Sequence, residues 1–214
     1  MAEESQNSNE KFDIKIVHDK FQASLIDEDD IDLELYLESF RELSKFFALL
    51  GSIFKFVNDD LQEKMDHLYS LQTSEQYKRV KTMIQHEKDK GLLEQRDFVS
   101  GSRTLLRIHR GLDFIRLFLK KLYELDHSEN TSPICKEAYN QTLANYHGFF
   151  IRQGAKLAMS LALPTKQDLL ITVCGNEEDI QRAIELLPDT LSVSNKVYDL
   201  VENLYTIHDL HRLP

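Results

Sequence analysis

The sequence predicts an all-α fold in one domain. Its 214 residues include only seven glycines and four prolines, so few positions interrupt regular structure. Apolar residues recur with a period near 3.6 in most long segments, which is typical of amphipathic helices. With 42% of residues hydrophobic, the chain can bury one substantial core. We therefore expect a single helical domain over residues 12–214, preceded by a polar, disordered tail over residues 1–11.

Composition and cysteine usage exclude several classes of protein. The formal net charge of −10 predicts no nucleic-acid partner, because a phosphate backbone is normally met by a basic surface. Cys135 and Cys174 are too few and too far apart for a disulfide framework, and we expect buried thiols in a reducing compartment. His86 and Glu87 resemble the start of a zinc-binding HExxH motif, but Lys90 replaces the second histidine, so no metal is expected. Without an apolar leader or a bilayer-spanning run, the chain is expected to be cytosolic.

Helices are expected in sequence along the N-terminal half. A first short amphipathic helix is indicated by the spacing of Ile14, Val17, Phe21 and Leu25. The acidic run at 27–30 is interpreted as a solvated loop that can supply the next N-cap. A long, bent helix is expected over residues 33–71, with Gly51 explained as a point of close contact inside it. A further helix over residues 75–90 ends at Gly91.

The C-terminal half continues the helical pattern. Helices are expected over 134–146 and 149–163, and Pro164-Thr165 ends the second and starts another. That next segment contains DLLITVCG, the most strand-like run in the chain, but it is short and flanked by helices, so we expect a helix there. Two further helices, over 177–187 and 192–205, complete the set.

One helix, over residues 100–122, is expected to be packed on two sides, as the middle element of a two-layer arrangement. One stripe is apolar: Leu105, Ile108, Leu112, Ile115, Leu119 and Leu122. The opposite stripe begins with arginines and ends with apolar residues: Arg103, Arg107, Arg110, Phe114, Leu117 and Phe118. A narrow arc is left to face water: His109, Asp113, Arg116 and Lys120.

The arginine stripe has two interpretations. Three aligned cations repel one another unless an anion lies opposite them, so the stripe is either an anion site or a structural network with carboxylates. In the helix over 33–71, the face that contains Asp60 and Lys64 is apolar first and charged second. If the two helices pack antiparallel, Asp60 and Lys64 come level with Arg103 and Arg107. The result is a polar lid over an apolar interior, which matches an amphiphile with a phosphate head.

No motif for catalysis is present. The sequence contains no GxSxG, Walker-type or dinucleotide-binding pattern and no ligand-spaced Cys/His cluster, so we expect no enzymatic activity and no cofactor. His147 precedes Gly148 at an expected helix end. Taken alone, such a histidine more often bonds a helix-terminal carbonyl than a ligand.

The residues from about Phe12 to Pro214 resemble the glycolipid transfer protein family, and most closely its ceramide-1-phosphate branch. The resemblance is carried by GSIFKFVNDDLQEK, SGSRTLLRIHRGLDFIRLFL, AYNQTLANYHGFFIRQG, ALPT and the terminal Leu213-Pro214. It implies a two-layer helical sandwich that encloses a hydrophobic lipid cavity and moves a sphingolipid between membranes without an energy source.

The same resemblance implies roles for individual residues. Asp60 would accept the N–H of the ceramide amide, and His147 would donate to the amide carbonyl. The phosphate would be held by Lys64, Arg103 and Arg107. The sugar-carrying branch places a stacking Trp at the position of Arg107, whereas this chain has no Trp, which favours a phosphate head. Arg110 is expected to pair with Asp60.

The membrane contact is where the chain departs from the family pattern. The family commonly has Pro-Trp after its Tyr-His, and here Gly148-Phe149 follows instead. We therefore expect Phe149 or Phe150, with Arg152 and Lys156, to contact anionic phospholipids. The resemblance also implies a monomer in the cytosol that associates peripherally with Golgi and plasma membranes. The alternative hypothesis is an anionic-lipid sensor, for example for phosphatidic acid, that binds lipid without transferring it.

Overall fold

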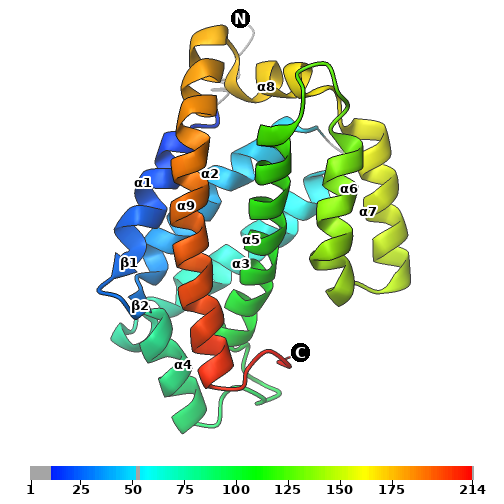
Figure 1. The fold of residues 1–214 in the computed structure, drawn as a ribbon. Coiled ribbons are helices and arrows are strands. Elements are labelled where there is room, and N and C mark those ends of the chain that lie inside the picture. The colour runs from blue at the N-terminus through cyan, green and yellow to red at the C-terminus, as the bar shows by residue number, and fades with distance from the viewer. Residues whose placement is uncertain (1–10, 52–53, 214) are drawn as a thin grey trace, which may run out of the picture.

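The computed structural model describes residues 11–51 and 54–213, and its described part is predominantly helical (Figure 1). In chain order the elements are α1 (Ile14–Ser24), β1 (Leu25–Ile26), β2 (Asp30–Ile31), α2 (Leu33–Leu49), α3 (Lys55–Leu71), the 3-10 helix η2 (Glu75–Tyr77), α4 (Val80–Asp89), α5 (Gly101–Glu124), α6 (Ser132–Gln141), the 3-10 helix η3 (Leu143–Tyr146), α7 (Phe149–Ala162), α8 (Lys166–Cys174) and α9 (Glu177–Ile207). The tail expected over residues 1–11 lies, apart from Lys11, outside the described residues.

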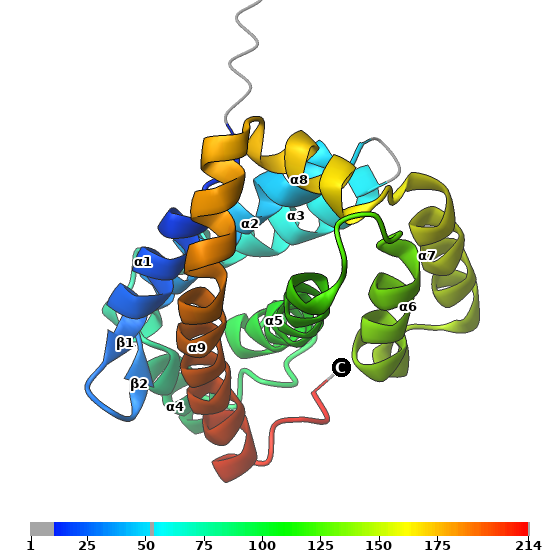
Figure 2. The same ribbon diagram turned by 45° about the horizontal axis from the view of Figure 1, so that its top comes forward.

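The helices form two layers around α5. In Figure 1, α9, α5, α6 and α7 stand side by side, while α2 and α3 pass behind them. α1 joins the layers because it packs on both α2 and α9. α4 lies at one end of the sandwich and α8 at the other, and Figure 2 shows α5 enclosed in the middle. The central, two-sided position expected for residues 100–122 is confirmed, since α5 contacts α3, α4, α6 and α9.

Both faces of α5 have the predicted character. On the first stripe, five of the six apolar residues are buried and Leu119 is half-buried. On the second stripe, Phe114 and Phe118 are buried beyond the arginines. The core also contains large side chains of α1, α2 and α9, among which Phe21, Tyr36 and Tyr205 are fully buried. One helix therefore supplies apolar surface to both halves of the interior.

The N-terminus of α5 is fixed by a buried carboxylate of α4. Glu87 accepts hydrogen bonds from the backbone N–H of Gly101 (2.7 Å) and Ser102 (3.0 Å) and from Ser100 Oγ (2.5 Å). These bonds satisfy N–H groups that a helix start leaves without partners. Gly101 lies so close to α4 that an added Cβ would be 2.8 Å from Met83 Sδ. Glu87 is thus a structural residue that sets where the arginine helix begins.

The expectation of one long helix over 33–71 is wrong, because the chain breaks at Gly51. This glycine has a φ of +94°, a left-handed conformation that favours glycine, and α2 ends just before it. A Cβ at Gly51 would meet nothing within 4 Å, so close contact does not explain the residue. Its role is to terminate α2 and let α3 start in a new direction.

Two further segments, an expected loop and an expected helix, differ in part from expectation. Residues 27–29 of the acidic run form the exposed turn that was expected, but this turn joins β1 to β2, which starts at Asp30, so two short paired strands interrupt the all-α pattern. Asp30 is buried and accepts from the backbone N–H of Lys81 at 2.9 Å, and the N-cap of α2 is Asp32, just after the run. The helix expected over 134–146 is divided at Thr142, whose ψ of −94° is not helical, into α6 and η3.

The two helices expected over 177–187 and 192–205 are one continuous helix, α9. Pro188 lies inside it, where the missing N–H removes one intrahelical bond without ending the helix. A buried face runs past Pro188, from Leu187 through Val193 and Val197 to Val201. Packing of that face against α1 and α5 stabilises the helix across the proline.

His109 was expected to face water, and this is wrong because α9 covers it. The side chain is only 1% exposed, and its Nε2–H donates to Glu202 Oε2 at 2.9 Å. Its ring stacks on Tyr198 with centroids 4.3 Å apart. Burial lowers the pKa of His109 below 6.5, and the bond to Glu202 opposes that shift.

Candidate functional site

α3 and α5, which carry most of the predicted polar site residues, pack against each other. In Figure 1, α3 descends behind α5 while α5 ascends. His67, on α3, donates from Nε2 to the carbonyl oxygen of Val99 at 2.9 Å, just before α5 starts. Lys64 and Asp60 lie one and two turns before His67. The contact between His67 and Val99 thus ties the second half of α3 to the start of the arginine helix.

Asp60 and Lys64 form an ion pair within α3. Lys64 Nζ donates to Asp60 Oδ1, and it lies 3.4 Å from the Asp60 backbone oxygen. The carboxylate side is open, with 65% of the Asp60 side chain exposed, whereas the Lys64 side chain is only 18% exposed. A carboxylate accepts several hydrogen bonds, so Asp60 keeps acceptor capacity toward solvent.

The arginines of α5 differ in how they are held. Arg103 is half-buried and its Nη2 donates to the carbonyl oxygen of Phe98 at 2.8 Å, which orients the guanidinium near the helix start. Arg107, one turn later, is exposed. The predicted pairing of Arg110 with Asp60 is wrong. Arg110 Nη2 instead donates to the carbonyl oxygen of His211 at 2.8 Å, and its guanidinium carbon lies 4.0 Å from the centre of the Tyr146 ring.

His147, the last of the predicted site residues, lies just before α7. It follows η3, and its Nδ1 lies 2.8 Å from the hydroxyl oxygen of Tyr139, so its partner is a hydroxyl group rather than a helix-terminal carbonyl. Burial lowers the pKa of His147 below 6.5, while the charge of Asp60 raises it and that of Lys64 lowers it. Asp60 and Lys64 therefore lie close enough to His147 for their charges to act on its ring. If Tyr139 donates to Nδ1, the neutral ring carries its proton on Nε2, which is then a donor.

A row of aromatic rings leads from His147 into the interior. The Tyr139 and Phe114 ring centroids are 6.4 Å apart, those of Phe114 and Phe118 are 6.1 Å apart, and those of Phe118 and Phe46 are 6.4 Å apart. The row crosses from α6 through α5 to α2. Polar groups thus lie at the surface end of a continuous apolar region.

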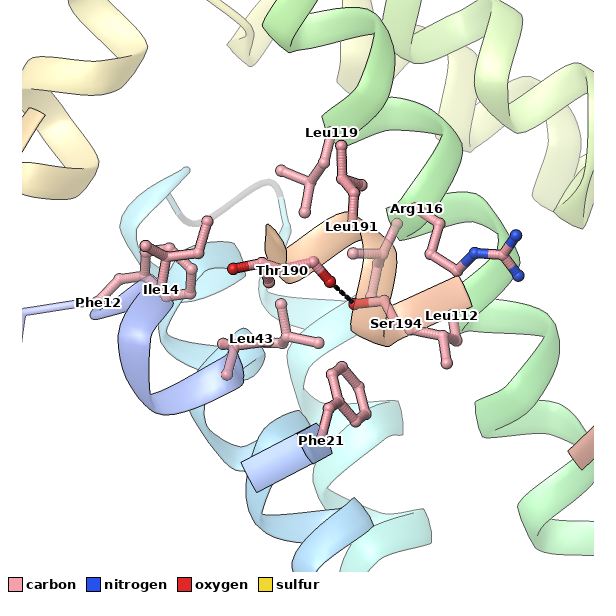
Figure 3. Close-up of a pocket in the computed structure, with 12 residues that line it drawn as sticks. Phe12, Ile14, Phe21, Leu43, Leu112, Arg116, Leu119, Thr190, Leu191 and Ser194 are labelled. Carbon is pink, nitrogen blue, oxygen red and sulfur yellow. Dashed lines mark hydrogen bonds between the residues drawn. The ribbon is translucent and has the colours of Figure 1, made fainter. Parts of the chain in front are cut away.

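A second apolar region lies on the other face of α5. A small apolar pocket lies between α1, α2, α5 and α9, with a volume of about 10 Å³, roughly what one water molecule requires. Figure 3 shows Phe21, Leu43 and Leu112 turned toward it, with the Arg116 guanidinium directed away. The labelled polar groups of Thr190 and Ser194 are engaged within α9, since Ser194 Oγ donates to the Thr190 carbonyl oxygen at 2.6 Å. Both sides of α5 therefore offer apolar surface to the interior.

The start of α7 exposes an unusual amount of apolar surface beside His147. Phe149 is 60% exposed and Phe150 87% exposed. The apolar surface extends further along α7 than the sequence analysis anticipated, through the exposed Ile151, Leu157 and Leu161. The spacing of Phe150, Leu157 and Leu161 was the available signal, because these residues share one helical face while α7 buries Ala155, Ala158 and Met159. Arg152 is exposed and Lys156 half-buried within the same helix.

The described residues offer neither a membrane span nor a metal site. No helix in residues 11–51 and 54–213 combines the length and apolar content needed to cross a bilayer. Within the same ranges, no group of three or more His, Cys, Asp or Glu residues is arranged to hold a metal ion. Cys135 and Cys174 are free and buried, as predicted, and burial raises the pKa of Cys135 to about 12.

Comparison with known proteins gives consistent matches. Residues 31–175 match the family model described as Glycolipid transfer protein (GLTP). The ceramide-1-phosphate transfer protein of Xenopus tropicalis is 36% identical over 217 aligned residues, which cover 97% of this chain and 99% of that protein. The apo-form crystal structure of mouse ceramide-1-phosphate transfer protein superposes with a TM-score of 0.88 at 34% identity, covering 95% of this chain and 100% of the mouse chain. The human protein in complex with 12:0 ceramide 1-phosphate gives a TM-score of 0.85 at 31% identity over the same shares of the two chains.

Proposed function

The chain belongs to the glycolipid transfer protein family, and from this membership and the geometry of its site we propose that it carries ceramide 1-phosphate between membranes. The observation that carries the proposal is that the charges of Asp60 and Lys64, on a helix that packs against α5 and its arginines around a buried apolar core, act on His147. A carrier of this kind performs no chemical step and needs no cofactor.

The phosphate is assigned to the cations. Arg107 is exposed on α5, Arg103 is oriented by the Phe98 carbonyl, and Lys64 lies on α3, which packs against α5. Guanidinium groups bind phosphate oxygens through paired N–H donors, and an ammonium adds a point charge. The match with a phosphate head is supported by the ligand of the human relative, which is a ceramide 1-phosphate.

The amide of the lipid is assigned to Asp60 and His147. An amide has one N–H donor and one carbonyl acceptor, so a carboxylate and an imidazole N–H complement it. Asp60 keeps an exposed carboxylate, and Tyr139 can hold the His147 ring with its Nε2 as the donor. These two residues distinguish an amide-containing sphingolipid from a glycerolipid.

The chains of the lipid are assigned to the apolar interior beneath. Burying hydrocarbon contributes about 0.8 kcal/mol per methylene, so two long chains amount to on the order of 20 kcal/mol. This burial free energy must match the free energy that the chains lose when the lipid leaves the bilayer. The polar contacts then act mainly to select the lipid.

Contact with the membrane is assigned to the start of α7. Phe149 and Phe150 are exposed apolar residues that follow His147 closely in the chain, and Arg152 supplies a cation for anionic phospholipids. We expect the protein to act as a monomer in the cytosol with peripheral contact to Golgi and plasma membranes, as the family resemblance implies.

A vesicle-to-vesicle transfer assay tests the proposal. Donor vesicles that contain fluorescent ceramide 1-phosphate, a glycosylceramide or phosphatidic acid are mixed with unlabelled acceptor vesicles. We expect rapid transfer of ceramide 1-phosphate and much slower transfer of the other two. Binding of anionic lipid without exchange would overturn the proposal and favour a sensor. Release of inorganic phosphate from the bound lipid would instead indicate a phosphatase.

A further inference from the structure

Arg110 connects the C-terminal segment, defined here as residues 208–213, to the turn that carries His147. Its Nη2 donates to the carbonyl oxygen of His211 at 2.8 Å, and its guanidinium carbon lies 4.0 Å above the Tyr146 ring. Arg110, Tyr146 and His211 line one small hollow at the surface, together with residues of α9. Arg110 is therefore not one of the proposed phosphate-binding residues, although it shares a helix face with Arg103 and Arg107.

The C-terminal segment is held firmly enough to provide a fixed acceptor. Leu210 and Leu213 are buried, at 6% and 8% exposure. Glu202, on α9, accepts from His109 and lies 3.7 Å from His211 Nε2. The carbonyl oxygen that Arg110 binds is thus located by packing on both sides of it.

The turn at the other end of this connection positions the proposed amide donor. Tyr146 is the last residue of η3 and directly precedes His147. The His147 ring is held by the Tyr139 hydroxyl, and the Tyr146 ring is held by Arg110. Tyr146 is 57% exposed, so little other packing fixes it.

From these contacts we propose that Arg110 is a positioning residue. It ties the turn of His147 to the C-terminal segment and thereby sets how strongly the site prefers a lipid with an amide over one without. Arginine suits this role because a planar guanidinium stacks on a ring with its face while it donates along its edge, which a lysine ammonium cannot do. The inference rests on the proposed function and adds a determinant of its specificity.

The affinity test replaces Tyr146, whose exposed ring can be removed without opening the core. Binding of short-chain ceramide 1-phosphate and short-chain phosphatidic acid is measured by calorimetry for wild type and Tyr146→Ala. Loss of the cation–π contact is expected to weaken ceramide 1-phosphate binding by about two- to fivefold and to leave phosphatidic acid binding unchanged. Tyr146→Phe keeps the ring, and Tyr123→Ala removes an exposed tyrosine elsewhere on α5, so both should match wild type. Equal weakening for the two lipids, or none, would overturn the inference.

A second measurement does not depend on lipid. The His147 imidazole is titrated by NMR in wild type, Tyr146→Ala, Arg110→Lys and Leu213→Asp, the last of which undocks the C-terminal segment. We expect the His147 resonances and titration midpoint to shift in all three variants and to stay constant in Tyr146→Phe. An unchanged His147 in all three would refute the coupling. If wild type bound and transferred neither lipid, the proposed function would fail, while this titration would still decide the inference.

Discussion

Lys64 and Asp60 form an ion pair one turn apart on α3, and each of the two also has its own place in the proposed lipid contacts. The ammonium group has three donors and the carboxylate has several acceptor sites, so the pair can persist while Lys64 meets a phosphate and Asp60 meets an amide N–H. In the proposed site, a single helical turn would thus present opposite charges to the two polar parts of one lipid. The first two predictions separate the contribution of the phosphate-binding cations from that of Asp60.

Arg107→Leu should abolish transfer of ceramide 1-phosphate. Charge-assisted hydrogen bonds contribute roughly 1.5–3 kcal/mol, which corresponds to a loss of about 10- to 150-fold in affinity. Transfer of the fluorescent lipid between vesicles measures the effect. Arg182→Leu, which removes an exposed arginine on α9, is the matched control and should transfer normally. Near-normal transfer by Arg107→Leu would refute the headgroup assignment.

Asp60→Val should stop transfer of sphingolipids whatever their headgroup, because the amide N–H loses its acceptor. Binding of phosphatidic acid, which has no amide, should remain, since the cations are retained. The neighbouring Asp59→Val is the control, because Asp59 is paired with Lys55 and is likewise exposed. The amide assignment fails if the two variants transfer ceramide 1-phosphate equally well.

Replacing Phe149 and Phe150 together by Ala should weaken binding to anionic vesicles. Both rings are exposed at the start of α7, and their removal deletes the apolar part of the proposed interfacial contact. Vesicle sedimentation measures the bound fraction. Ile207→Ala removes an exposed apolar side chain at the end of α9 and should bind like wild type. Wild-type binding by the double variant would locate the membrane contact elsewhere.

Glu87→Ala should destabilise the whole protein. Two backbone N–H groups and the Ser100 hydroxyl would lose a buried acceptor, at a cost of about 1–3 kcal/mol for each unsatisfied group. We expect the free energy of unfolding in urea to fall by roughly 3 kcal/mol or more. Glu94→Ala, at an exposed position in the following loop, should change it little. A similar urea midpoint for both variants would contradict the role of Glu87.

Stability should decrease as the pH falls below about 6.5. Burial lowers the pKa of His109 in the folded state below 6.5, so the unfolded chain takes up a proton first and unfolding becomes more favourable. His109 also lowers the pKa of Glu202 below 4.5. The stability that comes from this lowered pKa is present at moderate acidity and is lost only when the pH falls below 4.5. Urea midpoints at pH 7.5 and 5.5 measure the slope. His109→Gln should reduce this pH dependence of the urea midpoint. A smaller dependence should remain, because the pKa values of His147 and His208 are also lowered. Identical slopes in the variant and the wild type would show that His109 is not the cause.

The sequence predicts the helix set and the two faces of α5 well because periodicity records which side of a helix is covered. It does not predict the break at Gly51, since a lone glycine in an apolar run has the same pattern whether it allows close contact or a left-handed turn. His109 was placed in water for a related reason. A helical pattern describes one helix, and the covering by α9 depends on residues about 90 positions later.

The residues of the candidate site were identifiable because their order along α3, α5 and the Tyr-His turn resembles a known family. Their partners were less accessible. The acceptor of Arg110 is a backbone carbonyl of the C-terminal segment, and backbone groups have no sequence signature. In the sequence Glu87 resembles half of a zinc motif, whereas in the structure it accepts a hydrogen bond from the first residue of α5.

Two opposite edges of the molecule differ in charge. Acidic residues of the β1–β2 turn, Asp27, Glu28 and Asp29, are exposed at one edge in Figure 1, and α7 with Arg152 lies at the opposite edge. In the proposed membrane contact, an anionic bilayer would attract the Arg152 edge and repel the acidic turn, over roughly the 8–10 Å that physiological salt permits. The protein would then approach with α7 foremost, and its net charge of −10 would favour departure once the interfacial contact is lost.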